Sequence, residues 1–351
     1  MAENCPLSLP SETGHAMTES IVMPAAPSIP GLTFRSYRGP RDLPAMVSVA
    51  NASCAADGIE VIRTVADMEK DYEGLFHCDP FRDIVLVEVL GELVGYARCW
   101  WWEEVSGALL LGQWGFVAPR WRRLGIGRAM VAWIESRQRE IASAHGSKAE
   151  GLFQVLVTEH QVGLAAMLEK AGYQAARHFF RMVRPTLDAI PSLQLPDGLE
   201  LRPPLAEHHR AIWDAGNDAF DGYWGRAQEA AGSYEGWLTS ETAFQPHLWV
   251  VAWDVSKNEI AGQVRTLVNH AQNDKFNQRQ GFVELVAVRK SWRNRGVARA
   301  LLAKSLQIQR DEASDEVALS VDSQNISGAT QVYESCGFAV AKRTTAYRKL
   351  L

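Results

Sequence analysis

The sequence predicts two copies of one mixed α/β domain, arranged in tandem along 351 residues. A chain of this length suits two domains of ordinary size. Four landmarks recur in the same order, offset by 165 to 171 positions. Residues 185–198 contain three prolines and are typical of a linker. We therefore expect a disordered tail over 1–30, a first domain over 31–184, this linker, and a second domain over 199–351.

The four landmarks indicate an internal duplication, because they keep both their order and their spacing over the whole chain. The pairs are Gly31-Leu-Thr-Phe-Arg with Gly198-Leu-Glu-Leu-Arg, Gly91-Glu-Leu-Val-Gly95-x-x-Arg98 with Asn258-Glu-Ile-Ala-Gly262-x-x-Arg265, Arg122-x-x-Gly125-x-Gly127 with Arg293-x-x-Gly296-x-Ala298, and Ala171-Gly-Tyr with Cys336-Gly-Phe.

Hydrophobic periodicity predicts the elements of the first half in order. A short strand after Gly31 leads through a turn to a helix that begins near Asp42. A turn at Gly91-Glu92 joins two strands into a hairpin, and Pro119 ends the strand that follows. The second half repeats this order. The further first-half elements are the strands Ile84–Val89, Leu93–Trp102, Leu109–Val117 and Gln154–Thr158, a strand near Phe179–Val183, a helix that continues to about Ile141, and the helix Val162–Ala171.

The stretch from Glu284 to Ala303 contains an unusual basic turn. An apolar, β-branched strand precedes it, and a helix with apolar residues at helical spacing follows it. Cations at a helix N-terminus oppose the helix dipole by about 0.3–1 kcal/mol each. Free N–H groups also lie at that end, so an anion such as phosphate would explain the charges. Small residues at 296 and 298 would let the backbone approach it. The cations are Arg289, Lys290, Arg293 and Arg295.

This turn resembles the acyl-CoA signature of the GNAT superfamily of N-acyltransferases, and the element order of each half is similar to a complete GNAT domain. The tandem layout is similar to that of mycothiol synthase and its relatives. The resemblance implies two mostly antiparallel sheets flanked by helices, each splayed at an acyl-CoA cleft. It implies acetyl-CoA or another acyl-CoA as co-substrate, and no metal. The acyl-CoA contacts that it implies are Val286, Ala287, Val288, Arg293, Asn294, Arg295, Gly296, Val297, Ala298 and Asn325, with Val117, Arg122, Arg123, Leu124, Gly125, Ile126 and Gly127 in the first half.

Acyl transfer to an amine requires a base, a stabilised oxyanion and an acid for the leaving thiolate. The resemblance implies a carboxylate on the fourth strand as base and a tyrosine on a later helix as acid. Glu284 and Tyr333 hold these positions. Strand alternation places Glu284 on the face of Val286 and Val288, where an apolar environment would raise its pKa. A solvated or salt-bridged Glu284 and a packed Tyr333 are the alternatives, and Asn325 could equally cap its helix.

The first half lacks these groups. Gln113, Leu168 and His160 stand where the second half has Glu284, Tyr333 and Asn325. Glutamine cannot serve as a base and leucine cannot donate a proton. We therefore expect chemistry in the second half, while the first half either binds CoA or merely retains the turn.

Aromatic and acidic residues between Phe220 and Trp237 predict the acceptor side of the site. Tyr223 and Trp224 are our candidate substrate contacts, since aromatic rings suit an apolar or ring-bearing acceptor and nearby acids suit an ammonium group. An amphipathic helix with buried tryptophans is the alternative.

Composition narrows the class of protein. A net charge of −5 argues against a general nucleic-acid binder. Five scattered cysteines without a C-x-x-C pair favour a reducing cytoplasm. The histidines lack metal-ligand spacing, and we expect no membrane span and no signal peptide. We expect a monomer or homodimer.

The leading hypothesis is a cytoplasmic N-acyltransferase that acetylates a primary amine of a small molecule. One alternative is a mycothiol-synthase-like acetylation of a cysteinyl amino-sugar conjugate. Another is a CoA-binding sensor or scaffold without catalysis.

Overall fold

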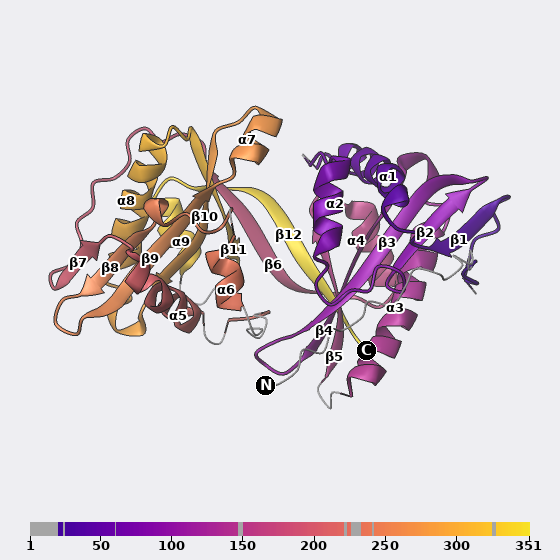
Figure 1. Ribbon diagram of the computed structural model, residues 1–351, viewed down its shortest axis with the longest axis horizontal. Coiled ribbons are helices and arrows are strands. Elements are labelled where there is room, and N and C mark those ends of the chain that lie inside the picture. The colour runs from indigo at the N-terminus through magenta and orange to yellow at the C-terminus, as the bar shows by residue number, and fades with distance from the viewer. Residues whose placement is uncertain are drawn as a thin grey trace, which may run out of the picture. The chain divides into compact units, whose positions relative to one another are not determined.

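The computed structural model describes residues 20–23, 25–59, 61–146, 150–220, 223–225, 233–240, 242–324 and 328–351. The chain divides into two compact units, Met1–Trp101 with Gly112–Gly146 and Trp102–Leu111 with Ser147–Leu351 (Figure 1). Among the described helices none is long and apolar enough to cross a membrane.

The first unit is a sheet with helices on both faces. Its strands follow the order β1 (Leu32–Ser36), β2 (Ile84–Val89), β3 (Glu92–Glu103) and β4 (Leu109–Val117), with β2 antiparallel to β1 and β3. Val85 and Val87 pack with α3 (Ile126–His145), whereas Ile84 and Leu86 pack with α1 (Leu43–Ala56) and α2 (Val65–Glu73). Alternation along β2 thus produces two cores. Two short 3₁₀ helices, Pro40–Asp42 (η1) and Pro119–Trp121 (η2), precede α1 and α3.

The segment just before β1 differs from our expectation of a disordered tail through residue 30. The Ile21 N–H donates to the Phe34 carbonyl at 2.8 Å, and Ser20 forms an isolated bridge with Arg35. Met23 is buried in the core beneath α3. The apolar side chains of this segment therefore bind it to the sheet although its sequence has no strand or helix periodicity.

The second unit has a longer sheet, whose pairs are antiparallel except for β10 with β11. This arrangement confirms the predicted mixed and mostly antiparallel sheet. The strands follow the order β5 (Gly151–Thr158), β12 (Ala339–Leu350), β6 (Gln174–Arg184), β11 (Glu316–Asp322), β10 (Gln280–Val288), β9 (Glu259–Val268), β8 (Val250–Asp254) and β7 (Leu199–Arg202).

β12 connects the two sequence repeats. It is the last strand of the chain, yet it pairs with β5 and β6, which both precede the linker. The compact units therefore do not follow the repeats, and the repeat boundaries that we drew from sequence stay a prediction.

Helices cover both faces of this sheet as well. α8 (Val297–Asp311) and α9 (Ala329–Ser335) share one core with β9, β10 and β11, and α5 (His209–Ala219) and α6 (Ser233–Leu238) share another with β8 and β9 (Figure 1). The remaining helices are α4 (Val162–Lys170), α7 (His270–Phe276), η3 (Ala206–His208), η4 (Pro246–Leu248) and η5 (Lys290–Trp292).

β10 separates from β11 part-way along its length. The parallel register with β11 covers Gln280–Val283, while the pairing with β9 continues to Val288. The second part of β10 therefore has a strand on one side, and this is the splay that a GNAT-like sheet is expected to show.

Candidate active site

The basic turns of the two halves have the same backbone conformation. Arg293 is extended, with ψ 156°, and is followed by Asn294 at φ 60° and Gly296 at φ 82°. In the first half Arg122 has ψ 159°, Arg123 has φ 62° and Gly125 has φ 93°. Each glycine is the N-cap of the following helix, α3 or α8. The strand–turn–helix that we predicted in both halves is confirmed, and such turns direct N–H groups toward one side, where an anion can bind.

The arginine three residues before the glycine of each turn, Arg293 or Arg122, holds the turn in place through hydrogen bonds. Arg293 Nε donates to the Val288 carbonyl at 3.0 Å, and its Nη2 donates to the Ala219 carbonyl at 3.3 Å. These bonds tie the end of β10 and the end of α5 to the turn. Arg293 therefore shapes the phosphate-binding backbone.

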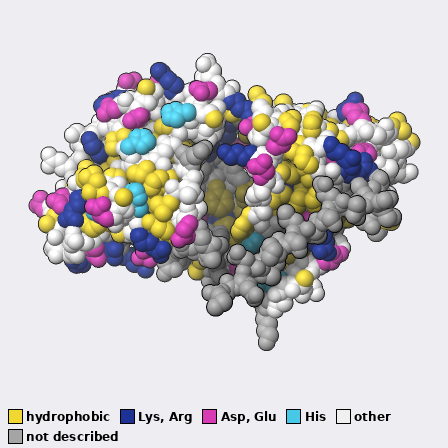
Figure 2. Space-filling model, viewed as in Figure 1, with side chains coloured by type: hydrophobic (Ala, Val, Ile, Leu, Met, Phe, Trp, Pro, Cys, Tyr) yellow, Lys and Arg dark blue, Asp and Glu magenta, His cyan; other side chains and the backbone are white. Residues whose placement is uncertain are grey.

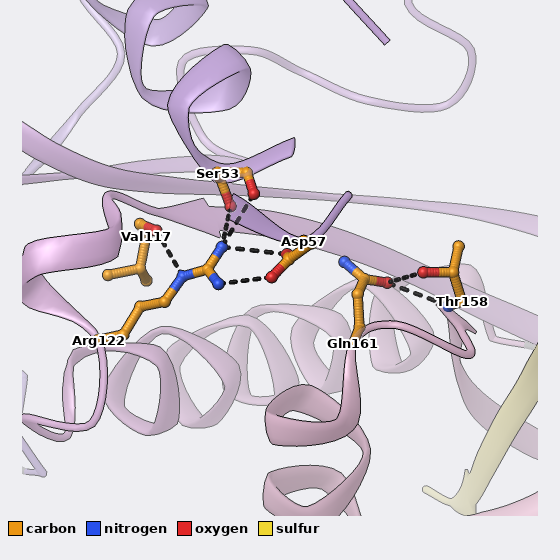
Figure 3. Close-up of polar contacts among 6 residues, drawn as sticks. All are labelled: Ser53, Asp57, Val117, Arg122, Thr158 and Gln161. Carbon is orange, nitrogen blue, oxygen red and sulfur yellow. Dashed lines mark hydrogen bonds and ion pairs between the residues drawn. The ribbon is translucent and has the colours of Figure 1, made fainter. Parts of the chain in front are cut away.

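Arg122 makes the equivalent hydrogen bond, as Figure 3 shows, and adds an ion pair. Its Nε donates to the Val117 carbonyl at 3.2 Å, and its Nη1 lies 2.6 Å from Asp57 Oδ1. Nη2 also donates to Asp57 Oδ2 and to the carbonyl and hydroxyl oxygens of Ser53. The positive charge of Arg122 is thus balanced within the first unit.

A cleft of about 210 Å³ opens beside the second turn. Its walls come from the end of α5, the first half of β9, the end of β10 and the basic turn, so cationic side chains and main-chain groups line the same cleft. Arg289 is partly balanced by Glu259, whose carboxylate lies 3.5 Å from Nη1. This donor set fits the phosphates of a CoA-type molecule. The lining residues are Ala215, Asp218, Ala219, Ile260, Ala261, Gly262, Gln263, Ala287, Arg289, Lys290 and Arg293.

The surroundings of the two glycines differ. A Cβ on Gly296 would have no atom of the described residues within 4 Å, whereas one on Gly125 would lie 3.3 Å from Pro27 Cβ. Pro27 belongs to the segment just before β1. Among the residues that the structure describes, the second turn is therefore open, and the first is partly covered by its own chain.

Glu284 lies on a β-bulge, which our strand-alternation argument did not foresee. The register between β10 and β9 shifts between Val283 and Leu285, so Glu284 is the extra residue. Val286 and Val288 pack against the α8 core, whereas Glu284 pairs with Arg265, whose guanidinium lies over the Trp237 ring of α6. The predicted common face of Glu284 with Val286 and Val288 is therefore wrong, because a bulge interrupts alternation.

The Glu284 carboxylate is 3.5 Å from Arg265 Nε, and its side chain is 30% exposed. Partial burial raises the pKa of the Glu284 carboxyl, and the Arg265 guanidinium opposes this rise. The direction agrees with our expectation, although Glu284 does not share the apolar face of Val286 and Val288. The sequence did not mark Arg265 as a site residue, and it appeared there only as part of a repeated landmark.

Tyr333 is buried in the α8 core, where its ring packs edge-on to Phe338 at 6.1 Å between centroids. Burial raises the pKa of its hydroxyl, and Tyr223 adds to the rise. The hydroxyl therefore keeps its proton at neutral pH and can act as a donor. Tyr223, a candidate substrate contact, is thus close enough to interact electrostatically with the candidate acid, and its ring lies 4.7 Å from that of Phe220.

Trp224 contacts side chains of β6 and β12. The Arg348 guanidinium lies 3.7 Å from its ring centroid, Arg177 lies 5.6 Å from it, and Phe179 packs at 6.0 Å. These partners come from β12 and β6. No sequence signal marked the two arginines, since they are far from Trp224 in the chain.

Asn325 lies outside the described residues. At the corresponding junction of the first half, Gln161 Oε1 accepts hydrogen bonds from the N–H of Thr158 at 3.1 Å and its hydroxyl at 3.3 Å (Figure 3). Of the first-half counterparts, Gln113 and Leu168 are buried and His160 is exposed. Gln113 cannot replace Glu284 as a base, and Leu168 cannot replace Tyr333 as an acid. His160 corresponds to Asn325 and stands at neither position.

Two acetyltransferase family models match the chain. One, described as an acetyltransferase (GNAT) family, matches residues 209–338, and the other, an acetyltransferase (GNAT) domain, matches residues 80–179. Together they span more than half of the sequence. The chain belongs to the GNAT acetyltransferase family. It is a tandem GNAT N-acetyltransferase, with one family match in each half.

Relatives and solved structures agree with this assignment. A mycothiol acetyltransferase from Thermobispora bispora is 28% identical over 88% of this chain and 97% of its own length. One from Thermobifida fusca is 29% identical over 67% of this chain and 73% of its own. A GCN5-related N-acetyltransferase from Sphaerobacter thermophilus has a TM-score of 0.72 at 27% identity and covers 91% of this chain and 95% of its own. A tandem GNAT protein from the clavulanic acid pathway shares the fold, with a TM-score of 0.62 at 15% identity over 91% and 98%.

Within the part of the chain that the structure describes, no group of three or more His, Cys, Asp or Glu side chains is placed to hold a metal ion. On the face shown in Figure 2, Lys and Arg side chains are interspersed with Asp and Glu.

Proposed function

We propose that this GNAT protein transfers the acetyl group of acetyl-CoA to a primary amine of a small molecule, and that the second repeat performs the chemistry. The contrast between the two turns carries the proposal. The backbone is the same, but the second turn opens on a basic cleft, while Pro27 and the Arg122–Asp57 pair occupy the surroundings of the first. The second repeat also keeps Glu284 and Tyr333, for which the first has Gln113 and Leu168.

The backbone from Arg293 to Ala298 would hold the pyrophosphate, with Arg289 and Lys290 at the same cleft. The free side of β10 beyond Val283 can accept an extended arm as an added strand. When bound there, acetyl-CoA supplies an activated thioester.

Glu284 would take a proton from the acceptor ammonium, which leaves the nitrogen lone pair free to attack. Its raised pKa suits a base near neutral pH, and its exposed part can be reached by the amine. Tyr333 would donate its proton to the sulfur as the carbon–sulfur bond breaks. The nitrogen then loses its second surplus proton to the Tyr333 phenolate, which restores the phenol, so the products are an amide, a thiol and a protonated Glu284.

The acceptor side would be formed by Tyr223, which interacts electrostatically with the candidate acid and whose ring lies 4.7 Å from that of Phe220. Trp224 supports the acceptor site less directly, because the Arg348 guanidinium already lies against its ring. A small molecule is favoured over nucleic acid because the net charge is −5 and the charges of the visible face are mixed.

Mycothiol-type chemistry is the second candidate. This candidate is supported by the mycothiol acetyltransferase of Thermobispora bispora, 97% of whose length aligns with this chain. The acceptor would then be a cysteinyl amino-sugar conjugate.

The test is a panel of primary amines, including a cysteinyl amino sugar, with acetyl-CoA and a free-thiol readout. The expected result is acceptor-dependent thiol release that Glu284→Gln abolishes. Tight acetyl-CoA binding without thiol release for any amine would favour the sensor or scaffold hypothesis.

A further inference from the structure

Arg265 on β9 is placed to act on one side chain. In the register of β9 and β10 it lies opposite Leu285, directly beside the bulge at Glu284. Its side chain is only 8% exposed, and Nε lies 3.5 Å from Glu284 Oε2. A bulge places two residues of one strand against one of its partner. Arg265 is the residue that faces this pair.

Apart from Glu284, the described surroundings of Arg265 do not satisfy the buried hydrogen-bond donors of its guanidinium. Nε and Nη1 are buried and have no hydrogen-bond partner among the described residues, and the guanidinium lies 5.1 Å from the centroid of the Trp237 ring. Burying a cation with unfilled donors costs free energy. Packing alone would be satisfied better by an apolar side chain, so the retained charge points to a role toward Glu284.

The acidic groups on the elements that pack beside β9 and β10 are paired with other residues, line the basic cleft or are exposed. On α5, Asp214 pairs with Arg210 at 2.9 Å, and Asp218 lines the basic cleft. On β11, Asp322 pairs with Arg177. α6 presents Trp237 to Arg265, while its Glu235 is exposed.

We propose that Arg265 is the positioning residue for Glu284: it holds the carboxylate of the bulge in place and favours the charged form that accepts a proton. This inference rests on the proposed role of Glu284 as the base. Without the guanidinium, the carboxylate would keep the burial and lose its cation, so its pKa would rise further. A base is needed deprotonated, and the acid limb of the pH–rate profile would move to higher pH.

The first half supplies a matched control. Arg98 occupies the repeated landmark position of Arg265, and its guanidinium lies 4.8 Å from the ring centroid of Trp114. Its Nε is also buried without a hydrogen-bond partner among the described residues. The residue that corresponds to Glu284 there is Gln113, which does not titrate. Arg98→Met therefore removes a comparable cation without touching a candidate base.

The test compares Arg265→Met, Arg265→Lys and Arg98→Met in the full chain, with melting temperature and acetyl-CoA binding as checks of folding. The readouts are the pH dependence of kcat/KM and a ¹³C NMR titration of glutamate-labelled protein, in which Glu284→Gln assigns the Glu284 signal. An opposite charge at this range lowers a carboxyl pKa by about 1–3 units. We expect Arg265→Met to move both the acid limb and the Glu284 titration midpoint to higher pH, by about 1 pH unit or more. In Arg265→Lys both values should return most of the way to those of the wild type. Arg98→Met should leave both unchanged.

The outcomes separate the two proposals. An unchanged Glu284 midpoint in folded Arg265→Met overturns the positioning role, and so does an equal shift in Arg98→Met. If Arg265→Met does not fold, Arg265→Gln replaces it, because glutamine keeps a polar side chain and removes the charge; an unchanged Glu284 midpoint in that folded variant overturns the positioning role as well. Full turnover of Glu284→Gln overturns the proposed base itself.

Discussion

At the scale of single residues, Tyr333 combines a packing role with a chemical one. Its ring contributes to the α8 core, and its hydroxyl keeps its proton because burial raises the pKa. Tyr333→Phe deletes the proton donor and preserves the ring. We expect turnover to fall about 10²–10⁴-fold, with acetyl-CoA affinity nearly unchanged, as measured by thiol release and calorimetry.

Tyr347→Phe is the matched control for this substitution. Tyr347 lies on β12, and its hydroxyl donates to the Glu169 carboxylate of α4 at 3.2 Å. Removal of this hydroxyl should leave turnover intact. Equal losses in both variants would contradict a specific acid role for Tyr333.

The Glu284 carboxyl also makes stability depend on pH. Its pKa is raised in the folded state, so its stabilising contribution is present below the unfolded pKa, about 4.3, and is lost as pH rises through the folded pKa. Glutamine at this position does not titrate. Urea unfolding should therefore show Glu284→Gln gaining stability relative to the wild type as the pH rises from the unfolded pKa, about 4.3, through the higher folded pKa. A relative loss over that range would mean that the Glu284 pKa is lowered instead.

At the scale of elements, the sequence predicted strands better than their irregularities. The bounds of β2 and β4 agree with expectation because continuous apolar runs between turns define them. The bulge at Glu284 was missed, because periodicity assumes unbroken alternation. α7 was missed too, although Asn269 caps it by accepting from the Gln272 N–H at 2.9 Å, since a helix this short has little periodicity.

The hydrogen bonds of Arg293 at the second turn predict that its geometry, and not its charge alone, supports acetyl-CoA binding. Arg293→Lys keeps the positive charge but cannot donate to both the Val288 and Ala219 carbonyls. We expect a lower melting temperature, a loss of about 1–3 kcal/mol in unfolding free energy, and weaker acetyl-CoA binding by calorimetry.

Arg295→Lys supplies the comparison, since Arg295 lies over the Trp292 ring at 5.0 Å. It changes the same residue type within the turn without touching the hydrogen bonds of Arg293. If Arg293→Lys binds acetyl-CoA as tightly as Arg295→Lys does, the charge of Arg293 matters and its hydrogen bonds do not.

At the scale of the whole molecule, the sequence predicted the duplication but not how strands of the two repeats pair. Repeated landmarks revealed two copies of one turn. They could not reveal that β12 would pair with β5 and β6, because strand partners far apart in the chain leave no local pattern. Nor could composition show that Pro27 would pack on Gly125. The family matches place a GNAT domain in each repeat, and the difference between the repeats lies in what surrounds each turn.

The central claim is that the second turn, and not the first, holds acetyl-CoA for catalysis. Calorimetric titration of acetyl-CoA into the wild type, Gly296→Val and Gly125→Val tests it most directly. Both glycines have positive φ, so valine strains each turn comparably, by about 1–2 kcal/mol. The account predicts one acetyl-CoA per wild-type chain, binding weakened more than tenfold in folded Gly296→Val, and little change in Gly125→Val. Loss of binding in Gly125→Val with normal binding in Gly296→Val would contradict it.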